Sequence, residues 1–158
     1  MSVNLLDIEK IELELSSDCN AACPGCARTQ LDGTYDVKNI TFADVQRLFP
    51  SKEYIDGKQF KICGVLGDPI VNPECLDILT YLAENGGYCV VSTNGSYNTA
   101  DWWTKLANVS TNTNKIKIHF CVDGHRETNH IYRVNTKFNV LERNMEAYSN
   151  AGGIGDWI

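Results

Sequence analysis

Residues 10–26 read KIELELSSDCNAACPGC, a strand-like pattern that runs directly into three closely spaced cysteines. Apolar residues alternate with glutamates in its first half, which predicts a β-strand with one apolar face over residues 10–15. Cys19, Cys23 and Cys26 then follow on a loop. Thiolates are soft ligands, and three of them within eight residues can converge on one metal centre. The stretch therefore predicts a metal site placed immediately after a strand.

The same order of strand, loop and amphipathic helix is expected to recur along the chain. Expected strands cover residues 10–15, 59–63, 88–92 and 115–122, with a fifth beginning at 156–158, and the helices between them include one capped by Thr41, one capped by Asn72, one around Trp102 and one over 137–150. Strands that alternate with helices predict βα units, with parallel strands joined by right-handed crossovers. The fold class is therefore expected to be α/β.

Each expected strand ends in an unusual loop, and parallel sheets place their sites at the carboxyl ends of the strands. These loops are the cysteine loop, Gly67-Asp68-Pro69, Thr93-Asn94-Gly95 and Cys121-Val122-Asp123-Gly124. We expect the four loops to face one shared opening. Asp123 is equally typical of a turn residue in front of a glycine.

Composition narrows the class of protein. The chain has 158 residues, 43% of them hydrophobic, which is enough for one core, and we expect residues 1–158 to form a single domain. A formal net charge of -6 argues against a general nucleic-acid binder, because neutralising phosphates requires a surplus of Lys and Arg. No stretch approaches the roughly 20 apolar residues that span a bilayer. The first ten residues lack the pattern of a signal peptide, so a cytoplasmic location is expected.

Seven cysteines without a signal peptide indicate reduced thiols rather than a disulfide framework. Cys63, Cys75 and Cys89 fall in expected strand or helix positions, where a free cysteine usually acts as a small buried apolar residue. Three thiolates on one loop can hold an iron–sulfur cluster and leave one iron of a four-iron cluster open. The alternative is a structural zinc site with a fourth ligand from elsewhere in the chain. The candidates for that ligand are His119, His125, His130 and Cys63.

Residues 19–28, Cys-Asn-Ala-Ala-Cys-Pro-Gly-Cys-Ala-Arg, resemble the signature loop of the radical S-adenosylmethionine (radical SAM) superfamily. In that family the three cysteines hold a 4Fe–4S cluster, and S-adenosylmethionine chelates the remaining iron. Reductive cleavage then yields a 5′-deoxyadenosyl radical that abstracts hydrogen from a substrate. The resemblance implies that Cys19, Cys23 and Cys26 are the metal ligands. Gly25 stands where the family usually carries an aromatic residue.

The resemblance extends to the later loops. Gly67-Asp68-Pro69 is similar to the Gly-Gly-Glu-Pro motif that contacts the amino group of S-adenosylmethionine, and Asn94 lies in the common ending of the third strand. Cys121 to Gly124 resembles the Ser-Ile-Asp-Gly element near the ribose. The resemblance thus implies that Gly67, Asp68, Pro69, Asn94, Cys121 and Asp123 are the cofactor-binding residues. Residues 128–133 are similar to members that often modify peptides.

For the fold, the resemblance implies a partial parallel (βα) barrel, an incomplete TIM-like barrel of about four βα units plus the start of a fifth. Because the chain stops just inside a strand, we expect it to be the N-terminal part of a longer enzyme. The implied partners are an unidentified substrate, with a peptide as one expectation, and a reductant such as flavodoxin or ferredoxin. The alternatives are an electron-transfer or binding module that holds the cluster without catalysis, and an inactive fragment of a longer radical SAM enzyme.

Overall fold

The computed structural model describes residues 4–31 and 34–158, so Met1 to Val3 of the segment considered for a signal peptide lie outside the described residues. The strands are β1 (Lys10–Leu13), β2 (Gln59–Ile62), β3 (Tyr88–Thr93), β4 (Ile116–Phe120) and β5 (Ile154–Trp157). The α-helices are α1 (Ala27–Leu31), α2 (Phe42–Leu48), α3 (Cys75–Glu84), α4 (Ala100–Thr113), α5 (Asn129–Tyr132) and α6 (Phe138–Asn150). Short 3-10 helices are η1 (Leu5–Asp7), η2 (Lys52–Tyr54) and η3 (Pro69–Val71).

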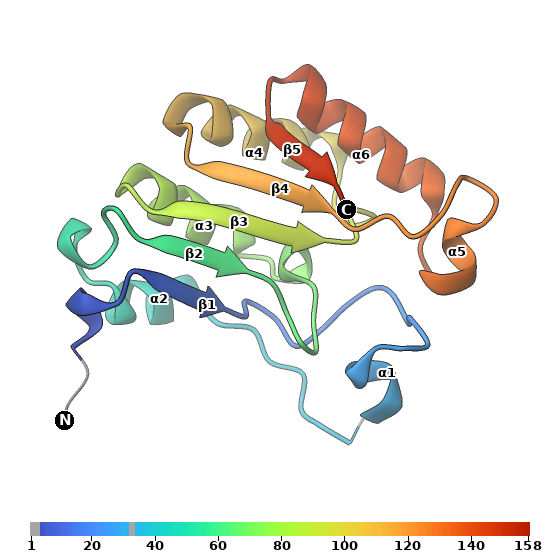
Figure 1. The fold of residues 1–158 in the computed structure, drawn as a ribbon, viewed down its shortest axis with the longest axis horizontal. Helices are drawn as coiled ribbons and strands as arrows, with labels where there is room; N and C mark the ends of the chain where they lie inside the picture. Colours follow the sequence, from blue (N-terminus) through green and yellow to red (C-terminus); the bar gives the residue numbers. More distant parts are fainter. Residues whose placement is uncertain (1–3, 32–33) are drawn as a thin grey trace.

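The strands form one open, fully parallel sheet in the order β1-β2-β3-β4-β5, so that each strand pairs with its neighbour in the sequence (Figure 1). In register, Lys10 lies opposite Gln59, and Gln59 lies opposite Tyr88. This arrangement confirms the predicted α/β class and the partial parallel (βα) barrel, with four βα units followed by a fifth strand.

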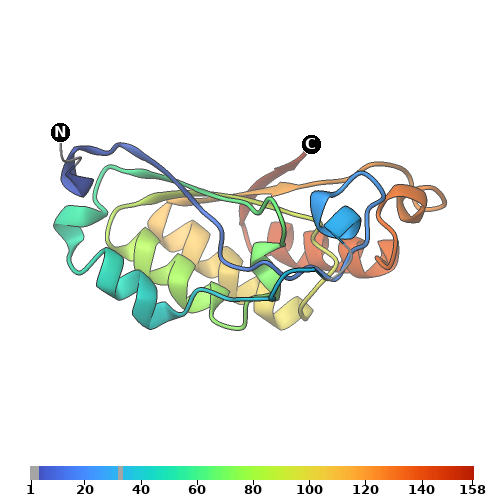
Figure 2. The same cartoon turned by 90° about the horizontal axis from the view of Figure 1, so that it is seen from below.

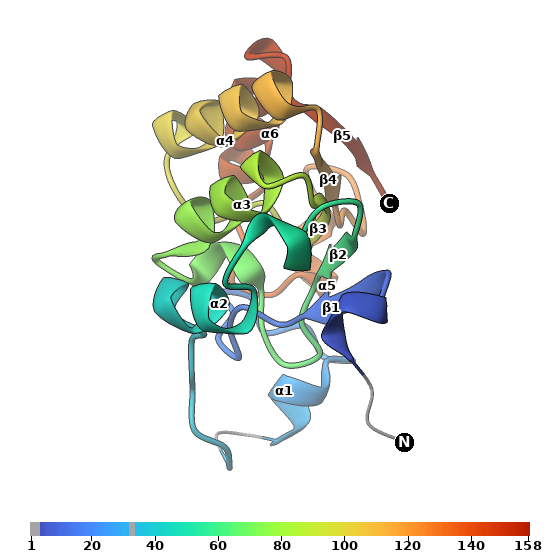
Figure 3. The same ribbon diagram turned by 90° about the vertical axis from the view of Figure 1, so that its left-hand side faces the viewer.

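The helices α2, α3, α4 and α6 cover one face of the sheet, and the opposite face is left largely uncovered (Figures 2 and 3). The apolar core lies between these two layers. Its largest fully buried side chains include Trp103, Tyr148 and Phe60. Trp103 and Tyr148 pack edge to face, with ring centroids 6.0 Å apart. Because the core is on the helical side, the strand residues on the other face remain available to a site.

The two predicted helix caps have different outcomes. Thr41 caps α2 in a capping box, in which its hydroxyl accepts from the Asp44 amide and the Asp44 carboxylate accepts from the Thr41 amide, each at 3.1 Å. The prediction for Asn72 is wrong, because α3 starts later and its cap is Glu74. Asn72 is buried, and its amide instead donates to the carbonyls of Leu15 and Ile40, both at 2.8 Å. The Asn72 side-chain oxygen accepts from the Glu74 amide at 2.9 Å, so this side chain spans the turn in front of α3 while its nitrogen holds two other segments.

The short helices α1 and α5 had no counterpart among the predicted elements. With five and four residues they are too short to be stable by helix propensity alone. Both lie beyond the carboxyl ends of the strands in Figure 1. Contacts between distant segments, rather than a local pattern, hold them there. No helix in the described part of the chain is long and apolar enough to span a membrane.

Candidate metal and cofactor site

A cavity of about 270 Å³ lies at the carboxyl ends of the strands. Its walls come from the four loops that the sequence predicted would face one opening. The predicted site residues on its wall are Cys19, Cys23, Cys26, Gly67, Asp68, Asn94, Cys121 and Asp123. Pro69 is the one predicted residue that does not line the cavity. It is buried at the start of η3, directly after Asp68.

The three cysteines of the signature loop are all free thiols on this wall. Cys23 is buried, whereas Cys19 and Cys26 are half-buried. The Cys26 amide donates to the Cys23 carbonyl at 3.0 Å, so the loop closes into a tight turn immediately before α1. On the far side of the turn, the Arg28 guanidinium donates to the Ala21 carbonyl. The loop is thus folded back on itself, with its sulfurs toward the cavity.

Polar groups from distant parts of the chain point at two of these sulfurs. The Asn94 amide nitrogen lies 3.6 Å from Cys19 Sγ, and an Arg133 guanidinium nitrogen lies 3.8 Å from Cys23 Sγ. The backbone amide of Ala21 also donates to Cys19 Sγ, at 3.4 Å. Hydrogen bonds to a sulfur favour its thiolate form, which is the form that binds metal.

Asp68 is buried and fully used by hydrogen bonds within the protein. Its carboxylate accepts from the hydroxyl of Thr93 at 2.8 Å, from the backbone amide of Asn94 at 2.8 Å and from the side chain of Asn94 at 2.7 Å. The Ile70 amide donates to it at 3.2 Å. Burial raises the pKa of the Asp68 carboxyl, although these hydrogen bonds oppose the rise. In this arrangement Asp68 joins the loop after β2 to the end of β3.

Gly67 lies where the loop after β2 passes against the segment after β1. A Cβ atom on Gly67 would stand 1.9 Å from the carbonyl oxygen of Ser16, so only glycine fits. Glu14 holds the same loop from the side, because its carboxylate accepts from the amides of Leu66 at 2.8 Å and Gly67 at 3.2 Å. The glycine of the predicted motif is therefore required by close backbone packing.

Asp123 and Cys121 line the cavity from the end of β4. Asp123 forms an ion pair with Arg133. Burial lowers the pKa of the Arg133 guanidinium, but the charges of Asp123 and Cys23 outweigh burial, and the pKa is raised. The Asp123 amide donates to the Asn129 side chain at 3.0 Å, so Asp123 also begins the turn into α5. Burial raises the pKa of the Cys121 thiol. Asp123 is therefore both a turn residue and a residue of the cavity wall.

The other three cysteines separate into two groups. Cys75 and Cys89 are buried in the core, as predicted. The prediction for Cys63 is wrong: it follows β2 instead of lying within it, is half-buried, and lines the cavity. Its thiol donates to the Glu12 carboxylate at 3.1 Å. Because β2 ends one residue earlier than expected, Cys63 falls on the loop wall and not in the core.

Three further residues of the site, Asn20, Tyr132 and Arg133, lie in stretches that carry the resemblance but were not predicted as site residues. Asn20 accepts from the Asn94 side chain at 2.9 Å and donates to the Ser96 hydroxyl at 3.0 Å, which ties the cysteine loop to the end of β3. Tyr132 and Arg133, on and after α5, line the cavity beside the cysteines. Their sequence spacing from the loop gives no indication of this contact.

The donor set suits a thiolate-bound iron cluster. Within the described residues, no group of three or more His, Cys, Asp or Glu side chains is arranged to hold a metal ion. The three cysteines nevertheless share one cavity wall, none is in a disulfide, and hydrogen-bond donors face two of their sulfurs. Burial, with the charge of Asp68, raises the pKa of the Cys19 thiol to about 11. Binding of iron would offset that rise, because a coordinated metal deprotonates the thiol.

The zinc alternative requires a fourth ligand near the cysteine loop. The three candidate histidines lie elsewhere, and only the candidate Cys63 lies on the wall of the same cavity. His119 lies on β4 with its Nε2 3.4 Å from the Asp156 carboxylate, and His130 is exposed on α5. His125 lines a different cavity. None of these histidines lies on the wall of the cysteine cavity as described, whereas Cys63 does.

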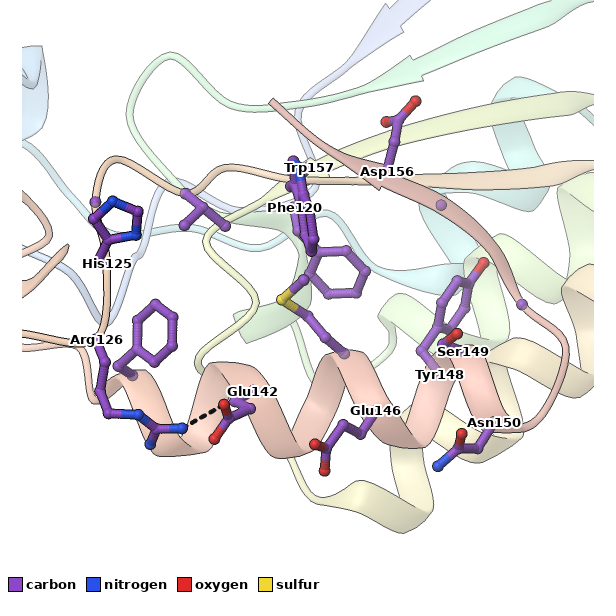
Figure 4. A pocket seen from close by; sticks show the side chains of 16 residues that line it. Phe120, His125, Arg126, Glu142, Glu146, Tyr148, Ser149, Asn150, Asp156 and Trp157 are labelled. Carbon is purple, nitrogen blue, oxygen red and sulfur yellow. Dashed lines mark hydrogen bonds and ion pairs between the residues drawn. The ribbon is translucent and has the colours of Figure 1, made fainter.

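A larger cavity of about 1010 Å³ lies between α6 and the last two strands, away from the predicted site. In Figure 4, Phe120 lines the cavity from the sheet side and Tyr148 lines it from α6. The Arg126–Glu142 ion pair lies at the rim. None of the residues predicted for the iron–sulfur cluster or for S-adenosylmethionine lines it, and of the candidate zinc ligands His125 does. The four predicted loops lie instead at the smaller cavity.

Solved structures of similar fold were found for almost the whole of this chain. The chain is similar to anSMEcpe with bound AdoMet, with a TM-score of 0.67 and 20% sequence identity over 94% of this chain and 42% of that one. It is also similar to anSMEcpe with bound AdoMet and the Cp18Cys peptide (TM-score 0.66, 19% identity, 94% and 42% covered). A further match is BtrN in complex with AdoMet and 2-DOIA, with a TM-score of 0.65 and 14% identity over 95% of this chain and 56% of that one.

Fold and site together define a partial parallel (βα) barrel with a three-cysteine loop at the carboxyl ends of its strands. The chain shares the fold of the radical SAM enzymes anSMEcpe and BtrN, which confirms the fold that the signature loop implied. It spans about two fifths to just over half of the length of these neighbours. No protein-family description matches the sequence, and no curated protein does.

Proposed function

We propose that this chain forms the core of a radical SAM enzyme, in which Cys19, Cys23 and Cys26 hold a 4Fe–4S cluster and S-adenosylmethionine binds beside it. When bound, the cluster would supply the electron that cleaves S-adenosylmethionine to a 5′-deoxyadenosyl radical, which abstracts hydrogen from the substrate. One observation carries the proposal: the three cysteines and the loops after β2, β3 and β4 line a single cavity. The AdoMet-bound neighbours of the same fold support it.

The residues around the cysteines have separate roles in this proposal. Asn94 and Arg133 place hydrogen-bond donors beside the sulfurs of Cys19 and Cys23, as outer partners of these proposed metal ligands. Asp68 fixes Asn94 in place, and Gly67 lets the loop after β2 approach the cavity closely. With Cys121 and Asp123, these loops form the wall on which S-adenosylmethionine is held.

The substrate of the proposed enzyme is unidentified. One neighbour of this fold has a bound peptide and another has the ligand 2-DOIA, so the fold accepts both kinds of molecule in related proteins. We propose a peptide, on the likeness of residues 128–133 to peptide-modifying members of the superfamily. A one-electron donor such as flavodoxin or ferredoxin would supply the reductant.

The proposal is tested by anaerobic reconstitution with iron and sulfide, followed by reduction and addition of S-adenosylmethionine. The expected product is 5′-deoxyadenosine, separated by chromatography. Cys23→Ala should abolish it, whereas Cys89→Ala, which removes a thiol from the core, should keep it in whatever fraction of the chain remains folded.

A second function is distinguished by the same experiment. Because the chain covers 42% of anSMEcpe and 56% of BtrN, a cluster-bearing module or inactive fragment without catalysis of its own is the competing class. Cluster formation without 5′-deoxyadenosine would favour that class. Zinc retained in place of iron after anaerobic purification would contradict both.

A further inference from the structure

The segment after α5 lies directly against the cysteine loop, although more than a hundred residues separate them in the sequence. The Ala22 amide donates to the Val134 carbonyl at 2.9 Å, which is a backbone hydrogen bond between the two segments. The Arg133 guanidinium reaches Cys23 Sγ at 3.8 Å. One contact thus holds the residue before the middle cysteine, and the other reaches the sulfur of that cysteine.

A third contact involves Tyr132 and Gly25. A Cβ atom at Gly25 would stand 3.1 Å from the Tyr132 hydroxyl oxygen, so the tyrosine is seated against the bare backbone of the glycine. A Cβ atom at residue 25 would require the Tyr132 hydroxyl to shift by a few tenths of an ångström, because 3.1 Å is closer than ordinary van der Waals contact. Tyr132 lines the same cavity as the cysteines. The glycine of the loop and the tyrosine of α5 therefore fit one another.

The segment that makes these contacts is itself anchored to the end of β4. Arg133 pairs with Asp123, and its guanidinium carbon lies 5.8 Å from the centre of the Tyr132 ring. Asn129, at the start of α5, is buried and accepts from the Asp123 amide at 3.0 Å. Thr136 closes the far end, since its hydroxyl donates to the Arg133 carbonyl at 2.7 Å. The contacting residues are thus held by the sheet on one side and by a turn on the other.

We propose that Tyr132, Arg133 and Val134 act as positioning residues that keep the cysteine loop ordered on the cavity wall before the cluster is bound. The inference rests on the proposed function in that the loop is taken to bind the cluster. A loop with three ligands must otherwise be ordered when the metal binds, at a cost in conformational entropy. Contacts that residues 132–134 make before the metal binds reduce that entropic cost. The Arg133 guanidinium also faces the sulfur of Cys23.

The first test needs no metal. Hydrogen exchange of the Ala22 amide is measured by NMR in the metal-free chain under anaerobic, reducing conditions. Tyr132→Ala and Arg133→Gln should each speed this exchange by roughly three- to tenfold, as expected when one hydrogen bond loses its support. The Cys89 amide, which donates to the Lys115 carbonyl at 2.7 Å inside the sheet, is the internal reference and should not change.

Two matched substitutions control for general destabilisation. Ile131→Ala removes a side chain that is 66% exposed from the residue before Tyr132. Arg126→Gln removes a guanidinium whose partner is Glu142, away from the cysteine loop. Both should leave exchange at Ala22 unchanged. If Tyr132→Ala does not fold, Gly25→Ala tests the same contact from the loop side, and adding Tyr132→Phe should partly relieve it by removing the nearest oxygen.

The second test follows release of iron from the reconstituted chain to a chelator. Arg133→Gln should speed release about tenfold, the usual effect of losing a partner of a metal ligand. Unchanged exchange at Ala22 in Tyr132→Ala and Arg133→Gln would overturn the inference, and so would faster exchange with unaltered iron release. Faster exchange in a chain that binds no iron at all would instead contradict the proposed function and leave the contact itself established.

Discussion

Asn94 donates two hydrogen bonds to one oxygen of Asp68, from its backbone amide at 2.8 Å and from its side chain at 2.7 Å. The same side-chain nitrogen lies 2.9 Å from the side-chain oxygen Oδ1 of Asn20 and 3.6 Å from Cys19 Sγ. A buried carboxylate on the loop after β2 therefore orients the amide that faces the first cysteine. This pairing connects three of the loops that form the candidate site.

Asp68→Asn is expected to destabilise the chain by about 1–3 kcal/mol, because asparagine keeps only one of the two acceptor oxygens, and the buried donors of either Thr93 or Asn94 would then face an NH2 group. The free energy of unfolding is measured by urea denaturation. Asp77→Asn changes an exposed carboxylate on α3 in the same way and should have little effect. Equal stability of the two variants would contradict the role given to Asp68.

Gly67→Ala is expected to cost about 3 kcal/mol or to prevent folding, because its Cβ would overlap the Ser16 carbonyl oxygen and neither backbone segment can move freely. Gly57→Ala is the comparison, since nothing lies within 4 Å of a Cβ there and only the positive φ of 75° opposes it. Denaturation of both variants should place Gly67→Ala well below Gly57→Ala in stability. The reverse order would show that the loop after β2 is free to move.

Cys19→Ala, Cys23→Ala and Cys26→Ala are each expected to lower the iron bound after reconstitution, because each removes one thiolate from a set of three. Cys63→Ala should keep its iron, although Cys63 lines the same cavity, because its thiol is directed to Glu12. Iron and sulfide per chain are the measured quantities. Loss of iron in Cys63→Ala would make that residue a fourth ligand.

The pH dependence of stability should carry a contribution from Tyr148. Its side chain is buried, and burial raises the pKa of its hydroxyl to about 12. The unfolded chain has a tyrosine pKa near 10, so the stabilising contribution is complete below about pH 10 and is lost as the pH rises toward the folded value. Stability should therefore fall by about 1 kcal/mol between pH 10 and 11 on account of this group.

Tyr148→Phe removes that group and should show a correspondingly smaller fall over the same interval. Its hydroxyl donates to the Ile154 carbonyl at 3.1 Å, so the variant should also be less stable at neutral pH. Tyr97→Phe, at an exposed tyrosine, is the control. Identical slopes for the unaltered chain and Tyr148→Phe between pH 10 and 11 would contradict the assignment.

Local pattern in the sequence was enough to predict the order of the strands and the place of the cysteine loop. Alternating residues in 10–15 and glycines after apolar runs reflect the two-residue period of strands and the turns that end them, and both are local properties. Parallel order then follows from the intervening helices. The convergence of the four loops needed no contact information, because carboxyl ends of parallel strands always share one edge.

Tertiary contacts decided the details that local pattern does not encode. Asn72 was expected to cap a helix, yet it bridges the carbonyls of Leu15 and Ile40 because the fold brings three segments together there. Cys63 was expected in the core, but a strand ending one residue earlier moves it to the cavity wall. Neither outcome alters the spacing of apolar and polar residues along the chain, so that spacing could not predict either of them.

The sequence by itself determined that three cysteines follow the first strand of a parallel α/β fold. Only the tertiary structure decided what surrounds them. Arg133 reaches Cys23 across 110 positions of sequence, and the Tyr132 hydroxyl lies close against the backbone of Gly25. The spacing of ligands along a loop is a short-range property of the chain, whereas the donors that face their sulfurs depend on how distant segments pack.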